Sequence, residues 1–192
     1  MFEREAHLTL KTFADKPTIT GDRVILRPVT ADDAEAFFNS LDDEETIRFT
    51  GTHASFTFEK IEAWTASRMD APDRLDLSII DRASDEWVGE LAIQAWDPHN
   101  HSCGFRIAIG PAGRNRGLGS EATRLIVDYV FENLPINRIA LEVFAFNPRA
   151  IHVYERAGFT REGVARSALH WDGEYHDAIL MSILRDEWTE RR

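Results

Sequence analysis

Cysteine is almost absent from this sequence of 192 residues: Cys103 is the only one, so no disulfide can form within the chain. No stretch approaches the roughly 18 consecutive apolar residues that a membrane-spanning helix requires. Residues 1–5 lack the basic and apolar regions with which a secretory signal opens. Together these absences predict a cytoplasmic protein that makes no contact with a membrane.

Positive charge is also scarce. The 22 lysines and arginines face 33 aspartates and glutamates, which gives a formal net charge of −11 at pH 7. A negative field repels nucleic acid and favours cationic small molecules or basic protein segments. His99 and His101 flank an expected turn without partners at metal-ligand spacing, and Cys103 does not complete a zinc site. We therefore expect neither a nucleic-acid partner nor a bound metal.

Apolar periodicity predicts a single α+β domain at residues 21–190, preceded by a polar arm at residues 1–20. The expected element order is β-α-α-β-β-β-α-β-α-β-β. The last helix of this order is short, with Asn147 as N-cap, Pro148 as its first residue and Gly158 just past its end. The approximate positions are a strand at 23–27, helices starting near 30 and 57, strands at 75–80, 87–96 and 103–109, a helix at 117–133, a strand at 138–144, the short helix from 147, and strands at 161–168 and 175–184.

The most informative segment is a glycine-rich turn. An apolar strand, 107–109, leads into a loop rich in glycine and arginine, and a helix opens directly from it. Gly117 and Gly119 lack a Cβ where a ligand would approach the backbone, and the first amides of the helix have no acceptor in their own helix. Such a turn suits a pyrophosphate, to which Arg114 and Arg116 would add positive charge. A plain helix start, with both arginines in water, is the alternative.

The spacing of the turn matches neither of two common nucleotide motifs, G-x-G-x-x-G and G-x-x-x-x-G-K-[ST]. Instead, Arg114-x-x-Gly117-x-Gly119 resembles the acyl-CoA signature [RQ]-x-x-G-x-[GA] of the GNAT acetyltransferase superfamily. Within it the chain resembles the Rim-type (RimJ/RimL-like) protein N-terminal acetyltransferases. Four further segments carry that likeness, in order along residues 20–189: 23–28 with Asp32-Asp33, 147–159, 172–177 and 186–188.

The resemblance implies a mixed, mostly antiparallel sheet flanked by helices, with a splayed centre that forms the acetyl-CoA cleft. The adenosine diphosphate end of acetyl-CoA would lie on the amides of the turn, and the pantetheine arm beside the strand before it. The resemblance also suggests a homodimer. It assigns cofactor binding to Ile107, Ala108, Ile109, Arg114, Asn115, Arg116, Gly117, Leu118, Gly119, Ser120 and Asn147.

Acetyl transfer to an amine needs a group or water path that takes a proton, and a group that gives one to the leaving thiolate. Glu142 is a lone carboxylate among apolar neighbours on the strand at 138–144, and burial there would strengthen it as a base. Tyr154 follows on the short helix, and a phenol stays protonated at neutral pH. By resemblance, Glu142 is the base and Tyr154 the general acid. A solvated carboxylate with a water relay, and a core tyrosine, are the respective alternatives.

The sequence thus predicts an acetyl-CoA-dependent N-acetyltransferase that acts on a primary amine, with a protein or peptide N-terminus as the leading candidate. An amino acid, a polyamine and an aminoglycoside are open alternatives, as is a non-catalytic acyl-CoA sensor. The acidic run 42–45 is either a solvated helix end or a patch that steers a cationic acceptor to the cleft.

Overall fold

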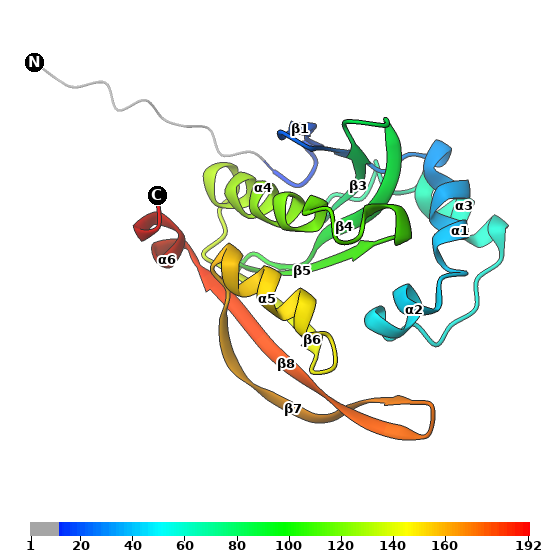
Figure 1. The fold of residues 1–192 in the computed structure, drawn as a ribbon. Helices are drawn as coiled ribbons and strands as arrows, with labels where there is room; N and C mark the ends of the chain where they lie inside the picture. The colour runs from blue at the N-terminus through cyan, green and yellow to red at the C-terminus, as the bar shows by residue number, and fades with distance from the viewer. Residues whose placement is uncertain (1–11) are drawn as a thin grey trace, which may run out of the picture.

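The computed structural model describes residues 12–192, so the first part of the predicted arm, residues 1–11, lies outside the described region. Within that region one eight-stranded sheet has the strand order β1-β2-β3-β4-β5-β6-β8-β7 (Figure 1). Neighbouring strands are antiparallel except β5 and β6, which are parallel. The strands are β1 Ile19–Thr20, β2 Val24–Pro28, β3 Leu75–Asp81, β4 Glu86–Asp97, β5 Ser102–Ile109, β6 Arg138–Phe144, β7 Thr160–Trp171 and β8 Glu174–Leu184.

The predicted helices and strands are all present in the predicted order, so the α+β class with a mixed, mostly antiparallel sheet is confirmed. The predicted limits of the short helix are also confirmed: Asn147 is its N-cap, and Gly158 ends it at a φ of +107°. The helices are η1 Ala31–Asp33, α1 Ala34–Ser40, α2 Glu44–Thr50, α3 Phe58–Ala66, η2 Pro111–Gly113, α4 Leu118–Asn133, α5 Pro148–Ala157 and α6 Arg185–Glu190.

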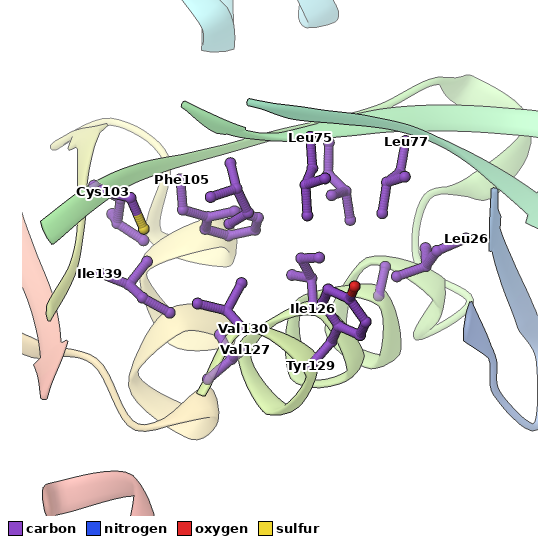
Figure 2. Close-up of a cluster of buried hydrophobic side chains, with 14 of the residues drawn as sticks. Leu26, Leu75, Leu77, Cys103, Phe105, Ile126, Val127, Tyr129, Val130 and Ile139 are labelled. Carbon is purple, nitrogen blue, oxygen red and sulfur yellow. The ribbon is translucent and has the colours of Figure 1, made fainter. Parts of the chain in front are cut away.

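The main hydrophobic core lies between the sheet and α4. Ile126 and Val130 on α4 are fully buried, and Figure 2 shows them facing Leu75 and Phe105 of the sheet. Burying one such side chain contributes roughly 1.5–3 kcal/mol to folding. The buried apolar side chains of α4 therefore fix it firmly against the sheet, and with it the turn from which α4 starts.

The opposite face of the sheet is polar, beneath α1 and α3. Arg27 donates to both carboxylate oxygens of Asp33, at 2.8 and 2.6 Å, and Ser78 of β3 donates to the same carboxylate at 2.9 Å. Asp33 is 3% exposed. This buried cluster fixes the segment between β2 and α1, because a buried carboxylate without partners would be strongly destabilising.

Four short elements were not predicted: β1, α2, η2 and α6. The acidic run 42–45 follows the end of α1, as expected, but it also begins α2, which was not expected. Asp43 is the N-cap of α2, and its carboxylate accepts from the Thr46 amide at 2.7 Å. Acidic residues in a first turn complement the positive end of the helix. The seven-residue helix carries too little apolar periodicity to be recognised from the sequence.

Candidate active site

The splay predicted at the centre of the sheet is present. β5 and β6 pair at only three positions, of which Gly104 opposite Ala140 is the last. Beyond it, β5 continues to Ile109 and β6 to Phe144 without pairing to each other. A cavity of about 510 Å³ occupies the opening between them. It follows that the second edge of β5, unlike the edge paired with β4, offers backbone groups to a ligand.

The glycine-rich turn forms one end of this cavity. Gly117, the N-cap of α4, has a φ of +77°, and Asn115 has a φ of +59°; both are left-handed conformations. At Gly119 an added Cβ would lie 3.1 Å from Cγ1 of Ile109, so this glycine lets α4 start close against β5. The first amides of α4 lack acceptors within their own helix. The turn therefore presents donors and a positive dipole end to an anion.

The two arginine side chains of the turn are already paired. Arg114 forms ion pairs with Asp43 and Glu45 of the α2 region, and its Nε donates to the Ile109 carbonyl at 3.1 Å. The hydrogen bond from Arg114 holds the pKa of Asp43 down at about 2. Arg116 pairs with Asp81 at 2.6 Å. Neither guanidinium is therefore an unpaired charge in this structure, and the amides are the stronger candidates for holding a pyrophosphate.

Most of the residues assigned to acetyl-CoA line the cavity, but two do not. Arg116 and Leu118 border a separate hollow beside Asp22 and Arg23 instead. The Leu118 side chain is 2% exposed and belongs to the core, so only its amide is available to a ligand. The assigned residues that line the cavity are Ile107, Ala108, Ile109, Arg114, Asn115, Gly117, Gly119, Ser120 and Asn147, together with Glu142 and Tyr154.

Tyr154 and Asn147 lie at the α5 side of the cavity. Asn147 Oδ1 accepts from the Ala150 amide at 3.0 Å, which leaves its side-chain NH₂ available to a ligand. The Tyr154 ring is 7% exposed and lies edge-on to Phe105 and Phe159, with ring centroids 6.2 and 6.0 Å away. Burial raises the pKa of Tyr154, so the phenol keeps its proton at neutral pH. Its position and protonation suit a proton donor.

Glu142 also lines the cavity, but the predicted burial is wrong: Glu142 is exposed. The reason is the splay. With β5 turned away, the strand face that would be covered in a continuous sheet opens into the cavity, whereas Leu141 and Val143 on the other face remain 8% and 7% exposed. Glu142 can therefore exchange protons with water directly.

The cavity passes through the sheet. Side chains alternate along a strand, so Phe105, Ile107 and Ile109 lie on the α4 face, while Arg106 and Ala108 lie on the α2 face. The α4 face of the cavity is bordered by the glycine-rich turn, Asn147 and Tyr154. The α2 face is bordered by Thr46, Phe49, Thr50, Thr52, Arg106, Glu142 and Phe144. Two ligands can thus enter from opposite faces and meet at the opening.

Sequence reasoning missed most of the α2 wall. Thr46, Phe49 and Thr50 could not be found because α2 itself was not predicted. Arg106 could have been found, since it is a lone charged residue in an apolar strand. That is the same signal that singled out Glu142.

No helix within residues 12–192 is long and apolar enough to cross a membrane. Nor do three or more metal-ligating side chains of that region gather at one point.

The sheet, its splay and the turn between β5 and α4 define the class expected from the sequence, a transferase with an acyl-CoA cleft. Comparison with known proteins agrees. Residues 23–160 match the acetyltransferase (GNAT) domain, so the chain belongs to that family. It is a GNAT N-acetyltransferase, and enzymes of this family use acetyl-CoA.

Three relatives illustrate the range of similarity. The uncharacterized, prophage-derived N-acetyltransferase YokL of Bacillus subtilis is 24% identical over 88% of this chain and 94% of its own. YdaF of Bacillus subtilis, whose name provisionally assigns it to ribosomal N-acetylation, is 32% identical over 52% of this chain and 55% of its own. A crystal structure of spermidine N-acetyltransferase from Vibrio cholerae, in complex with CoA and spermine, has a TM-score of 0.81 at 22% identity, over 88% of this chain and 99% of its own.

Proposed function

We propose that this enzyme transfers the acetyl group of acetyl-CoA to a primary amine, and that the acceptor is a protein or peptide N-terminus. The observation that carries the proposal is the cavity that passes through the splayed sheet, with a glycine-rich turn on one face and Glu142 on the other. An acyl donor and an amine can occupy it together. We further propose a cytoplasmic enzyme that forms a homodimer.

Acetyl-CoA fits the α4 face of this site. The pyrophosphate would be held by the amides of residues 114–120, where α4 presents its positive end. The amides of pantetheine would pair with the free edge of β5 at residues 107–109, in the manner of an added strand. Asn147 would bind the far end of pantetheine with its side-chain NH₂. The thioester would then lie beside the Tyr154 hydroxyl.

The reaction needs one proton removed and one delivered. The amine nitrogen, as the free base, forms a bond to the thioester carbonyl carbon, and the carbon–sulfur bond breaks. Glu142, directly or through water, takes the proton that the amine loses. Tyr154 gives its proton to the departing thiolate and regains one from solvent. The products are the acetylated amine and free CoA, and no covalent enzyme intermediate is required.

Glu142→Gln tests the base. The amide keeps the size of the side chain but cannot accept a proton, so kcat/KM for the acceptor should fall by about tenfold or more at neutral pH. The KM for acetyl-CoA should stay unchanged, because Glu142 lies on the other face of the cavity. Glu86→Gln, on an exposed residue at the start of β4, is the matched control. A small effect at Glu142 with an intact pH dependence would assign deprotonation to a water relay.

A polyamine is the second candidate acceptor. Its support is the fold similarity to the spermidine N-acetyltransferase of Vibrio cholerae, which extends over 88% of this chain. Mass spectrometry of acetyl-CoA reactions with N-terminal peptides, amino acids, polyamines and aminoglycosides would separate the candidates. Best activity on a polyamine would overturn the N-terminal assignment and keep the chemistry. No thiol release with any amine would leave an acyl-CoA sensor.

A further inference from the structure

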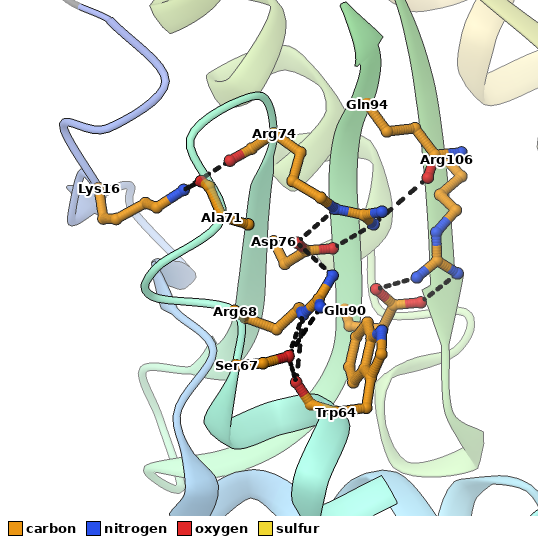
Figure 3. A network of polar contacts seen from close by, with 10 residues as sticks. All are labelled: Lys16, Trp64, Ser67, Arg68, Ala71, Arg74, Asp76, Glu90, Gln94 and Arg106. Carbon is orange, nitrogen blue, oxygen red and sulfur yellow. Dashed lines mark hydrogen bonds and ion pairs between the residues drawn. The ribbon is translucent and has the colours of Figure 1, made fainter. Parts of the chain in front are cut away.

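The α2 face of the sheet carries a charged network that ends at the cavity (Figure 3). Arg106 of β5 forms a bidentate ion pair with Glu90 of β4: Nη1 of Arg106 lies 2.8 Å from Oε1 of Glu90, and Nη2 lies 3.1 Å from Oε2. Glu90 is 3% exposed. Further along the same face, Asp76 of β3 pairs with Arg74 at 2.6 Å and with Arg68 at 3.9 Å.

This network carries an excess of positive charge. Three guanidinium groups, those of Arg68, Arg74 and Arg106, share the carboxylates of Asp76 and Glu90. Burial raises the pKa of Glu90, and the Arg106 guanidinium beside it acts in the opposite direction. Of the three arginines, only Arg106 lines the cavity, and its side chain is 39% exposed against 17% for Arg68 and 23% for Arg74. Arg106 is therefore the arginine of this network that a ligand in the cavity can reach.

Arg106 and Glu142 flank the opening as a pair. The last paired residues of the two parallel strands are Gly104 and Ala140, and Arg106 and Glu142 each follow two residues later. Side chains at paired positions of a parallel sheet lie on the same face, and so do those two residues further on. Within residues 12–192 the ion-pair partner of Arg106 is Glu90, not Glu142. A cation and an anion thus border the two sides of the acceptor entrance.

We propose that Arg106 determines acceptor specificity by binding an oxygen next to the amine, so that the acceptor is an α-amine beside a carbonyl or carboxylate group. This proposal rests on the proposed acetyltransferase function. With the amine near Glu142, the adjacent oxygen accepts a charge-assisted hydrogen bond from the Arg106 guanidinium. A peptide N-terminus and a free amino acid share this chemistry. A polyamine does not, because its further amines are cations that Arg106 repels.

The test compares acceptors with and without an oxygen group beside the amine, and kcat/KM is calculated on the concentration of free base, because an α-amine has a lower pKa (about 8) than an alkylamine (about 10.4). The acceptors are ethylamine, alanine, alaninamide and an alanyl peptide amide, with spermidine as the polycation, and thiol release from acetyl-CoA is measured for each. We expect kcat/KM with the alanyl peptide amide to exceed that with ethylamine by about tenfold or more, the size typical of a hydrogen bond to a charged group. The kcat/KM for alanine, compared with that for the alanyl peptide amide, then shows whether a free amino acid or an N-terminus is the better acceptor.

Two variants assign the preference to Arg106. Arg106→Gln removes the positive charge, but it also leaves the buried Glu90 without its ion-pair partner. The double variant Arg106→Gln/Glu90→Gln therefore replaces both charges with amides. In the double variant the preference for the oxygen-bearing acceptor should fall by about tenfold or more relative to the parent enzyme, because the same hydrogen bond is lost. The KM for acetyl-CoA should not change. Arg124→Gln, on an exposed residue of α4, is the control.

Three results would overturn the proposal, and they differ from failure of the function itself. The first is ethylamine or spermidine as the best acceptor of the parent enzyme. The second is a double variant that keeps the preference while losing rate equally with all acceptors, which would make the ion pair purely structural. The third is a double variant that loses as much activity with spermidine as with the peptide. Absence of thiol release with every amine would instead contradict the acetyltransferase function on which the proposal rests.

Discussion

Tyr154→Phe is expected to lower the rate of acetyl transfer by about 10²–10⁴-fold, the usual contribution of a general acid, and to leave acetyl-CoA affinity nearly unchanged. The substitution removes one hydroxyl and keeps the ring that packs against Phe105 and Phe159. Because burial raises the pKa of Tyr154, the parent enzyme has its donor proton in place across the neutral pH range. The departing thiolate of the variant must take its proton from water.

The measurement is thiol release in a single turnover, so that slow product release does not conceal the chemical step. Calorimetry with CoA supplies the affinity. Tyr129→Phe is a matched control, since Tyr129 is 8% exposed, lies on α4 and does not line the cavity. A rate within threefold of the parent would remove Tyr154 from the mechanism and leave it a core residue.

Gly119→Glu is expected to abolish CoA binding while the fold is retained. The new carboxylate would stand in the first turn of α4, where the pyrophosphate of CoA is proposed to lie, and would repel it. The added Cβ would lie 3.1 Å from Cγ1 of Ile109, so the neighbouring side chain need move by only a few tenths of an ångström. Circular dichroism checks folding, and calorimetry with CoA measures binding.

Two further variants separate charge from bulk. Gly119→Ala adds the Cβ without the carboxylate and should retain most of the affinity. Gly163→Glu places the same carboxylate on β7, where an added Cβ meets nothing within 4 Å, and should bind CoA as the parent does. If Gly119→Glu kept its affinity within about twofold, or roughly 0.4 kcal/mol, the phosphate site would lie elsewhere.

Features set by neighbours in the sequence were predictable. The short helix α5 is an example, because Asn147, Pro148 and Gly158 each act on the backbone within a turn of their own position. The strand alternation that placed Glu142 on one face and Leu141 on the other is equally local. The turn before α4 was recognisable because its glycines stand at fixed spacing.

Features set by distant segments were not predictable. The partner of Arg114 is Asp43, 71 residues away, and only the packing of α2 beside the turn brings them together. The exposure of Glu142 depends on where β5 leaves β6, which no property of β6 alone determines. The ion pair between Arg106 and Glu90 depends on the register of β4 and β5, which the sequence of neither strand determines by itself.

The passage of the cavity through the sheet has a consequence for the order of events in turnover. On the proposed placement, a donor on the α4 face and an acceptor on the α2 face would not share an entrance, so neither substrate would need to leave before the other arrives. Initial rates at varied concentrations of both substrates should therefore give intersecting double-reciprocal lines, the signature of a ternary complex. Parallel lines would require an acetylated enzyme, as in a ping-pong scheme. Dead-end inhibition by CoA together with an unreactive acceptor analogue would show whether the two faces fill independently.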